Sequence, residues 1–207
     1  MRAAAKFLSI VLHPLFMPFY TMVLAFRLDP HLVFLLLGGN GQLLWVNMLM
    51  VFVMTAIFPL VSCLLFLRAG VITHITMPTR QERIMPFTVT LFYYGLTFYM
   101  LHKSPHHPAT YGMLLGAMVA LALTLAITLR WKISVHMVGI GGLLGALSAL
   151  LVLHGTFAPI EMAFMILLAG ALGTARLLTS DHTAGQVHAG AVLGFASTFL
   201  CVLFYPA

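Results

Sequence analysis

Charged residues are scarce in this sequence, and acidic residues are the scarcest of them. Only 7% of the 207 residues are charged, and four of these are aspartate or glutamate. A soluble domain carries about 25% charged residues, which cover its water-facing surface. The scarcity therefore excludes an ordinary soluble fold. No polar stretch is long enough to form a second domain, so we expect a single domain over residues 1–207.

Cysteine and clustered basic charge are also nearly absent. Cys63 and Cys201 both lie inside apolar runs, where we expect them to be buried small hydrophobic residues rather than a disulfide. The net charge of +6 comes from single basic residues at the ends of apolar runs. That pattern is typical of anchoring to lipid headgroups and excludes a nucleic-acid-binding surface. We expect no removable signal peptide, because Pro14 and Pro18 interrupt the first apolar run and no small-residue cleavage site follows.

Long hydrophobic runs are what the sequence does contain, and hydrophobic residues make up 62% of it. Crossing a bilayer takes about 20 mostly apolar residues. Backbone groups in hydrocarbon must be paired within the segment, so such runs form helices. The sequence predicts an all-α integral membrane protein, a multi-pass bundle of about seven transmembrane helices. The predicted spans are 7–26, 43–67, 86–102, 109–129, 135–154, 157–177 and 187–205. The shorter segment 31–37 is predicted to lie at the interface and to end in a glycine-rich turn.

Small residues recur at four-residue spacing in the last three predicted spans. The pairs are Gly141 with Gly145, Ala169 with Gly173, and Gly190 with Gly194. Small side chains allow helix backbones to approach closely in membranes. The spacing therefore predicts that spans five to seven pack together as a compact core.

The distribution of basic residues indicates an orientation. If side A is the side that holds the N-terminus, seven crossings place eight basic residues on side A and only Arg27 and Lys103 on side B. The eight are Arg2, Lys6, Arg68, Arg80, Arg83, Arg130, Lys132 and Arg176. The positive-inside rule then favours a cytoplasmic side A in the inner cell membrane.

Three polar segments, 77–86, 132–136 and 175–186, all fall on side A. Together they bring arginines, histidines and a serine to one membrane face. Guanidinium groups match phosphate oxygens, and histidine can act as a nucleophile or proton donor near neutral pH. The convergence indicates a phosphate-binding pocket at headgroup level. Each residue also has a simpler interpretation, because arginines at helix ends anchor helices and Ser134 could cap a helix.

These segments resemble the signature of the type 2 phosphatidic acid phosphatase superfamily of membrane lipid phosphatases. That signature reads Lys-x6-Arg-Pro, then Pro-Ser-Gly-His, then Ser-Arg-x5-His-x3-Asp. Residues 133–136, Ile-Ser-Val-His, keep the Ser and His of the second part. Arg176 and His182 keep the spacing of the third part, and the first part is matched loosely by Arg80, Arg83 and Pro86. The resemblance covers residues 76–200 and implies a phosphatase-like core, to which residues 1–68 add N-terminal spans.

The resemblance implies roles for individual residues. His182 would be the nucleophile that forms a phosphohistidine, and His136 would protonate the leaving oxygen. Arg176 and Ser134 would hold the phosphate oxygens, and either Arg80 or Arg83 would supply the basic group of the first part.

The sequence departs from the family pattern at several positions. Gln186 stands where the family has the aspartate that orients the nucleophile, and Asp181 is a second orienting candidate beside His182. Thr76 stands where the family has its lysine, and Ile133 and Val135 replace its Pro and Gly.

The implied function is hydrolysis of a lipid phosphate or diphosphate monoester from the bilayer, with no metal and no other cofactor. Two alternatives are a catalytically divergent membrane protein that binds lipid or anions, and a small transporter. A zinc site at His102, His106 and His107 is a weaker reading, because no acid or cysteine joins them. The sequence predicts no particular oligomeric state.

Overall fold

The computed structural model describes residues 2–29, 31–32, 41–179 and 182–205, and every regular element in these ranges is a helix. Seven helical segments are long and apolar enough to cross a membrane, and their ends lie within a few residues of the predicted spans. The prediction of a multi-pass helical membrane protein is confirmed. The predicted interfacial segment 31–37 and the glycine-rich turn after it fall mainly outside the described residues.

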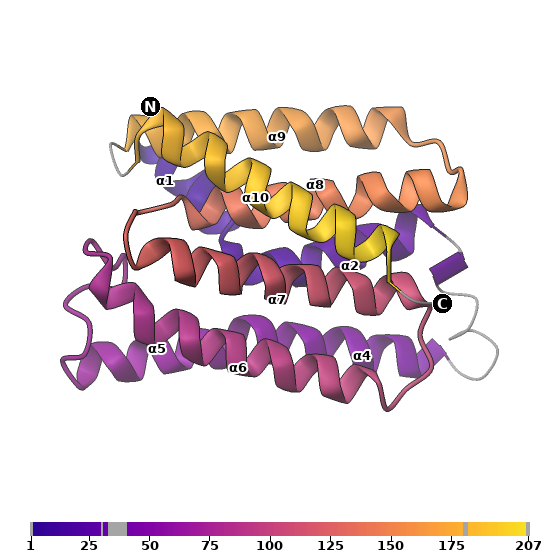
Figure 1. The fold of residues 1–207 in the computed structure, drawn as a ribbon, viewed down its shortest axis with the longest axis horizontal. Coiled ribbons are helices and arrows are strands. Elements are labelled where there is room, and N and C mark those ends of the chain that lie inside the picture. Colours follow the sequence, from indigo (N-terminus) through magenta and orange to yellow (C-terminus); the bar gives the residue numbers. More distant parts are fainter. Residues whose placement is uncertain (1, 30, 33–40, 180–181, 206–207) are drawn as a thin grey trace.

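The seven segments lie beside one another along the long axis of the bundle (Figure 1). The first combines α1 (Arg2–Val11) with α2 (Met17–Leu28), and the second combines α4 (Gly41–Phe52) with α5 (Phe58–Arg68). The others are α6 (Ile84–Leu101), α7 (Pro108–Thr128), α8 (Val135–His154), α9 (Pro159–Leu178) and α10 (Ala184–Leu203).

The first span is broken at its prolines. A single 3-10 turn, η1 (Pro14–Phe16), separates α1 from α2, and the His13 side chain accepts a hydrogen bond from the Leu15 backbone N–H at 3.3 Å. Proline supplies no N–H and is tolerated only where a helix begins. The break changes the packing partner, because α1 packs on α9 whereas α2 packs on α8.

The second span carries a π-helical segment, η2 (Val53–Ile57), directly before Pro59 in the first turn of α5. A proline inside a continuous α-helix would clash with the carbonyl four residues earlier. The wider turn accommodates the ring while the span continues, and the Thr55 hydroxyl donates to the Val51 carbonyl at 2.8 Å.

Glycines set the close approach of α8 to α10. A Cβ at Gly194 would collide with the Val138 carbonyl oxygen, and a Cβ at Gly190 would lie 2.6 Å from the Ser134 carbonyl oxygen. The Thr198 hydroxyl reinforces this contact by donating to the Gly142 carbonyl at 2.7 Å. The predicted close packing of spans five and seven is therefore confirmed.

The third close-packed partner differs from the prediction. On α9, a Cβ at Gly173 would make only ordinary contacts with Val187 and Met137. On α7, a Cβ at Gly116 would lie 2.6 Å from Thr198 Cα, and Gly112 is equally tight against α10. The tight seam thus joins α7, α10 and α8, whereas α9 packs on α1 and α8 without such close approach.

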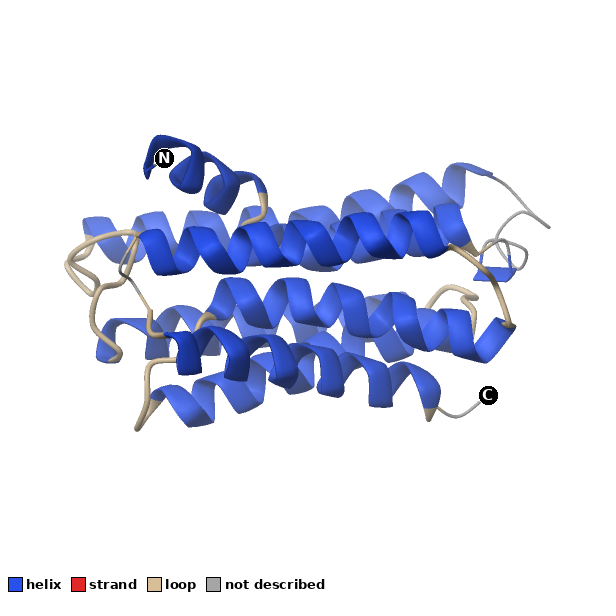
Figure 2. Ribbon diagram, turned by 90° about the horizontal axis from the view of Figure 1, so that it is seen from above, coloured by secondary structure: helices blue, strands red, loops and turns tan. Residues whose placement is uncertain are grey.

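The three polar segments lie at the same end of the bundle. The loop before α6, the start of α8, the end of α9 and the start of α10 all lie at the end of the bundle where α1 begins (Figure 1). Figure 2 shows the N-terminus at this end and the C-terminus at the other. The topology inferred from the sequence therefore brings these loops to side A.

Candidate functional site

A cavity of about 860 Å³ lies between the helices and reaches the side A end. Each of the three polar segments contributes to its wall there. The charged and imidazole side chains lining this end are Lys6, His13, Arg83, Lys132, His136, Arg176 and His182. We call this end the cationic mouth.

His182 lies immediately before α10 and is buried. Its Nδ1 lies 3.0 Å from Gln186 Oε1, and the same oxygen accepts the Thr183 backbone N–H at 3.2 Å. An amide oxygen can only accept, so Nδ1 must carry the proton of the neutral ring. The Nε2 lone pair is thereby left available to an electrophile.

The surroundings of His182 keep its imidazole neutral. Burial lowers the pKa of His182 to about 4, and the neighbouring charges of Arg176, Arg83 and Lys132 act in the same direction. The hydrogen bond to Gln186 opposes the shift only in part. At pH 7 the ring is therefore uncharged, which is the form that a nucleophile requires.

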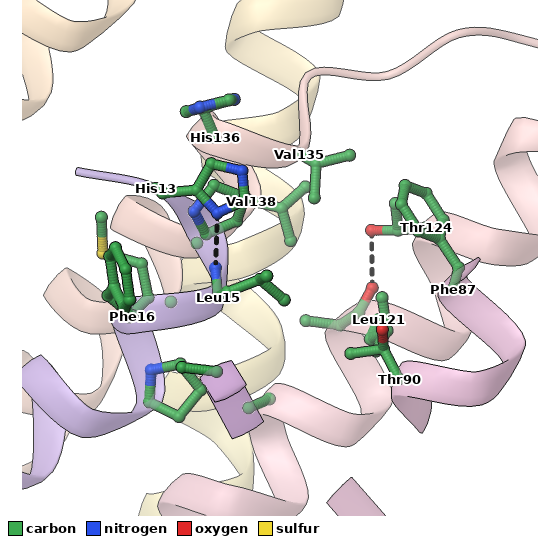
Figure 3. Close-up of a pocket in the computed structure, with 18 of the residues that line it drawn as sticks. His13, Leu15, Phe16, Phe87, Thr90, Leu121, Thr124, Val135, His136 and Val138 are labelled. Carbon is green, nitrogen blue, oxygen red and sulfur yellow. Dashed lines mark hydrogen bonds between the residues drawn. The ribbon is translucent and has the colours of Figure 1, made fainter. Parts of the chain in front are cut away.

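His136 occupies the first turn of α8 and contacts α1. Its Nε2 lies 3.1 Å from the Ser9 carbonyl oxygen, so Nε2 donates and Nδ1 keeps its lone pair when the ring is neutral. The ring packs edge-on against His13 (Figure 3), and the ring centroids are 5.3 Å apart.

Ser9 connects this histidine to Arg176. The Ser9 hydroxyl donates to the Ala5 carbonyl at 2.9 Å and accepts from Arg176 Nη1 at 3.4 Å. The sequence analysis missed the contribution of α1, including His13. The available signal was the spacing of Ser9 and His13, two polar residues one helical turn apart in an apolar run.

The two arginines before α6 differ in burial and in their hydrogen-bond partners. Arg83 is buried, and its guanidinium donates to the Met77 carbonyl at 3.1 Å and to the Ile133 carbonyl at 3.3 Å. Arg80 is exposed, does not line the cavity, and donates to the Arg130 carbonyl at 2.6 Å. The structure therefore brings Arg83, and not Arg80, to the cationic mouth.

Glu82 organises the loop that walls one side of the mouth. Its carboxylate accepts from the Thr73 N–H at 3.0 Å, from the Thr73 hydroxyl at 2.5 Å and from the Thr79 N–H at 3.4 Å. Within this loop Met77 adopts a positive φ of 47°, and residues 75–78 line the cavity. The loop is thus fixed between Glu82 and Arg83.

The remaining residues expected at the site have other places. Ser134 is the N-cap residue of α8 and is fully buried, but its side chain makes no capping hydrogen bond and does not line the cavity. Its backbone N–H donates to the Gln186 carbonyl at 3.3 Å, which joins the starts of α8 and α10. Asp181 lies outside the described residues.

The histidines of side B do not form a joint metal site. His102 bonds the Tyr205 hydroxyl, whereas His107 accepts from the Ala109 N–H and packs against His154. Over the described ranges, no group of three His, Cys, Asp or Glu side chains is placed to hold a metal ion. His154 instead forms an ion pair with the buried carboxylate of Asp29.

No family model, curated protein or solved structure matches the chain. The chemistry of the site is therefore inferred from its own geometry. A neutral imidazole with a defined lone pair lies among guanidinium and ammonium groups at the mouth of an apolar cavity. Such a set can attract an anion and present a nucleophile to it.

Proposed function

We propose that this protein is an integral membrane phosphatase that hydrolyses a lipid phosphate or diphosphate monoester through a phosphohistidine at His182. The observation that carries the proposal is the hydrogen bond from His182 Nδ1 to Gln186, which places the proton of the neutral ring on Nδ1 and leaves the lone pair on Nε2. Arg83, Lys132 and Arg176 lie close enough to His182 to act on its charge. They supply the positive potential that a transferring phosphoryl group needs.

In the first step, His182 Nε2 attacks the terminal phosphorus, and the bond from that phosphorus to the leaving oxygen breaks. The leaving oxygen is the lipid oxygen of a monophosphate or the bridging oxygen of a diphosphate. The departing oxygen takes a proton from His136. The leaving group is then the free lipid alcohol or, from a diphosphate, the lipid monophosphate. For this step His136 must be protonated at Nδ1 in addition to the Nε2 proton that it donates to Ser9. Arg83 and Arg176 balance the charge on the phosphoryl oxygens.

In the second step, water attacks the phosphohistidine. The now neutral His136 Nδ1 accepts a proton from this water, the new phosphorus–oxygen bond forms, and the phosphorus–nitrogen bond breaks. Inorganic phosphate leaves, and both histidines return to their starting protonation states. The same residue thus serves as acid and then as base.

The test is phosphate release from lipid phosphates by purified protein and by two histidine variants. His182→Ala should abolish release and the acid-labile phosphoprotein, because the nucleophile is removed. His188→Ala is the matched control, since His188 lies in α10, close to His182 in the chain, and has an exposed side chain. Full release by the His182→Ala protein would eliminate the mechanism.

One observation favours a second candidate, a lipid-phosphate-binding protein without turnover. Gln186 is neutral, so it orients His182 but does not offset the positive charge of a phosphohistidine. This candidate predicts that the wild-type protein retains a lipid phosphate through purification and releases no phosphate from it.

We propose further that the cationic mouth faces the cytoplasm of the inner cell membrane. The support is the excess of eight basic residues over two on side A. A cysteine introduced at His74, in the exposed loop before α6, should resist an impermeant thiol reagent in intact cells. A cysteine at Lys103, at the opposite end, should react with it, and the reverse pattern would overturn this orientation.

A further inference from the structure

The cavity extends far beyond the cationic mouth. Along α6 its lining runs from Pro86 to Leu101, and along α7 from Thr124 to Thr110. At 1.5 Å per residue these stretches correspond to about 22 Å and about 21 Å. Half of the hydrocarbon core of a bilayer is only about 15 Å thick. The cavity therefore continues past the depth that the tails of one leaflet occupy.

The wall below the mouth is mostly apolar, and the hydroxyls of three of its threonines are already paired within their own helices. The hydroxyl of Thr90 donates to the Pro86 carbonyl, and that of Thr124 donates to the Ala120 carbonyl, each at 2.7 Å. Thr21 is satisfied in the same way within α2. Because these hydroxyls bond to their own helices, a ligand meets their methyl groups.

Apolar side chains make up most of the wall directly beneath the mouth. Figure 3 shows Phe16, Phe87, Val135 and Val138 around the space beside His13 and His136. Tyr94 adds a phenol to the wall, but it follows Pro86 by about 12 Å along α6. A glycerolipid would place its ester carbonyls just below the phosphate, where burial without hydrogen bonds is unfavourable.

We propose that the substrate is a polyprenyl-type lipid phosphate, in which one long hydrocarbon chain is joined directly to the phosphate and lies inside the bundle. This inference rests on the proposed function for the fate of the phosphate. The mouth binds the anion through its cationic side chains. The chain then follows α6 and α7 past the middle of the membrane. A two-chain glycerolipid such as phosphatidate is a poorer occupant, because its esters would lie against an apolar wall.

The inference is tested with single-chain phosphates of increasing length. Values of kcat/KM should rise with chain length until the chain spans about 21 Å, and should then level off. The kcat/KM for long-chain polyprenyl phosphate should exceed that for dioleoyl phosphatidate by about tenfold or more. A plateau at chains that end within one leaflet, or equal turnover of phosphatidate, would overturn the inference.

A pair of α7 variants tests the path of the chain. Ala117→Trp fills the cavity about halfway along α7, whereas Ala122→Trp places the same side chain on the exposed face of that helix. Ala117→Trp should lower turnover of long-chain polyprenyl phosphate by about tenfold or more and leave hexyl phosphate within about twofold. Ala122→Trp should leave the turnover of both substrates unchanged. Unchanged use of the long chain by Ala117→Trp would contradict the inferred path.

Binding separates this inference from the proposed function. If no lipid phosphate is hydrolysed, the phosphatase proposal fails. Native mass spectrometry then decides the present inference. Retention of long-chain polyprenyl phosphate by the wild-type and Ala122→Trp proteins, with loss in Ala117→Trp, supports it. Equal retention by all three proteins, or preferential retention of dioleoyl phosphatidate, overturns it.

Discussion

The amide oxygen of Gln186 lies 3.0 Å from Nδ1 of His182, one helical turn earlier in the chain. The same oxygen accepts the Thr183 N–H, and the Thr183 hydroxyl accepts the Gln186 N–H, which completes a capping box at the start of α10. The residue that holds the histidine is therefore also part of the capping box that stabilises the start of the helix. This coupling lets the fold position the imidazole without a charged partner.

Replacement of Gln186 by glutamate should raise the pKa of His182. Burial holds that pKa at about 4 in the wild-type protein, so protonation of the nucleophile should lower kcat/KM only as the pH approaches 4 from above. A carboxylate at this position would stabilise the imidazolium, and the acidic limb should move up by about 1–2 pH units. Glutamate also preserves the capping box, so the helix start should remain intact. The pH profile of phosphate release measures the shift.

The control for this variant is Gln81→Glu. Gln81 is exposed at the same end of the bundle, so the substitution adds the same charge away from the cavity wall. Its pH profile should match that of the wild type. An acidic limb that stays in place in Gln186→Glu would argue against His182 as the titrating nucleophile.

The two arginines before α6 should differ in their sensitivity to substitution. Arg83→Lys keeps the charge but removes the fork that reaches both the Met77 and Ile133 carbonyls, so we expect kcat/KM to fall by about tenfold or more. Arg80→Lys changes an exposed residue outside the cavity and should stay within about twofold. Kinetics with thermal unfolding of both proteins separates loss of binding from loss of fold. Comparable losses of kcat/KM in the two variants would contradict the proposed role of Arg83 at the phosphate.

The contact of α8 with α10 should tolerate no side chain at Gly194. Gly194→Ala would place a methyl group against the Val138 carbonyl oxygen and 2.8 Å from the Gly142 nitrogen. We expect a loss of about 2 kcal/mol of stability and a lower Tm in detergent. Gly170→Ala is the matched control, because a Cβ there has nothing within 4 Å. Alanine favours the helix by about 1 kcal/mol over glycine, so this Tm should hold or rise.

The ion pair of Asp29 with His154 should stabilise the side B end. The Asp29 side chain is 1% exposed, and it also accepts the His31 N–H at 3.0 Å. Asp29→Ala leaves the buried partner groups without their acceptor and should cost about 3 kcal/mol. Glu161→Ala removes an exposed carboxylate at the start of α9 and should be nearly neutral. Thermal unfolding of the two proteins compares them, and equal Tm values would show that the pair contributes little.

The order of the membrane-spanning helices in the described residues could be predicted from the sequence. Apolar runs such as 135–154 are long enough to cross the bilayer, and hydrocarbon leaves the backbone no other way to pair its polar groups. The break at Pro14 and the π segment before Pro59 were not predicted. Proline shows that a helix must adjust, but the form of the adjustment depends on the helices that pack around it.

Spacing of small residues predicted only part of the packing. Gly190 and Gly194 do mediate a tight contact, but the same spacing at Ala169 and Gly173 does not. The spacing indicates that a helix can approach another closely, but it does not indicate which helix that partner is. Gly112 and Gly116, which pack on α10, have the same four-residue spacing, but their contact was not predicted.

The sequence alone determined that the chain contains long apolar helices, and within the described residues seven of them are long enough to cross a membrane. It also predicted that the polar loops share one end, because span length and crossing parity follow from composition and order. Tertiary structure decided which side chains meet there. Arg83 rather than Arg80 lines the cavity, and α1 enters the site through Ser9 and His13. It also decided that the apolar space runs past the middle of the bundle. Side-chain direction and the gaps between helices depend on contacts between segments distant in the chain, and no local pattern encodes those contacts.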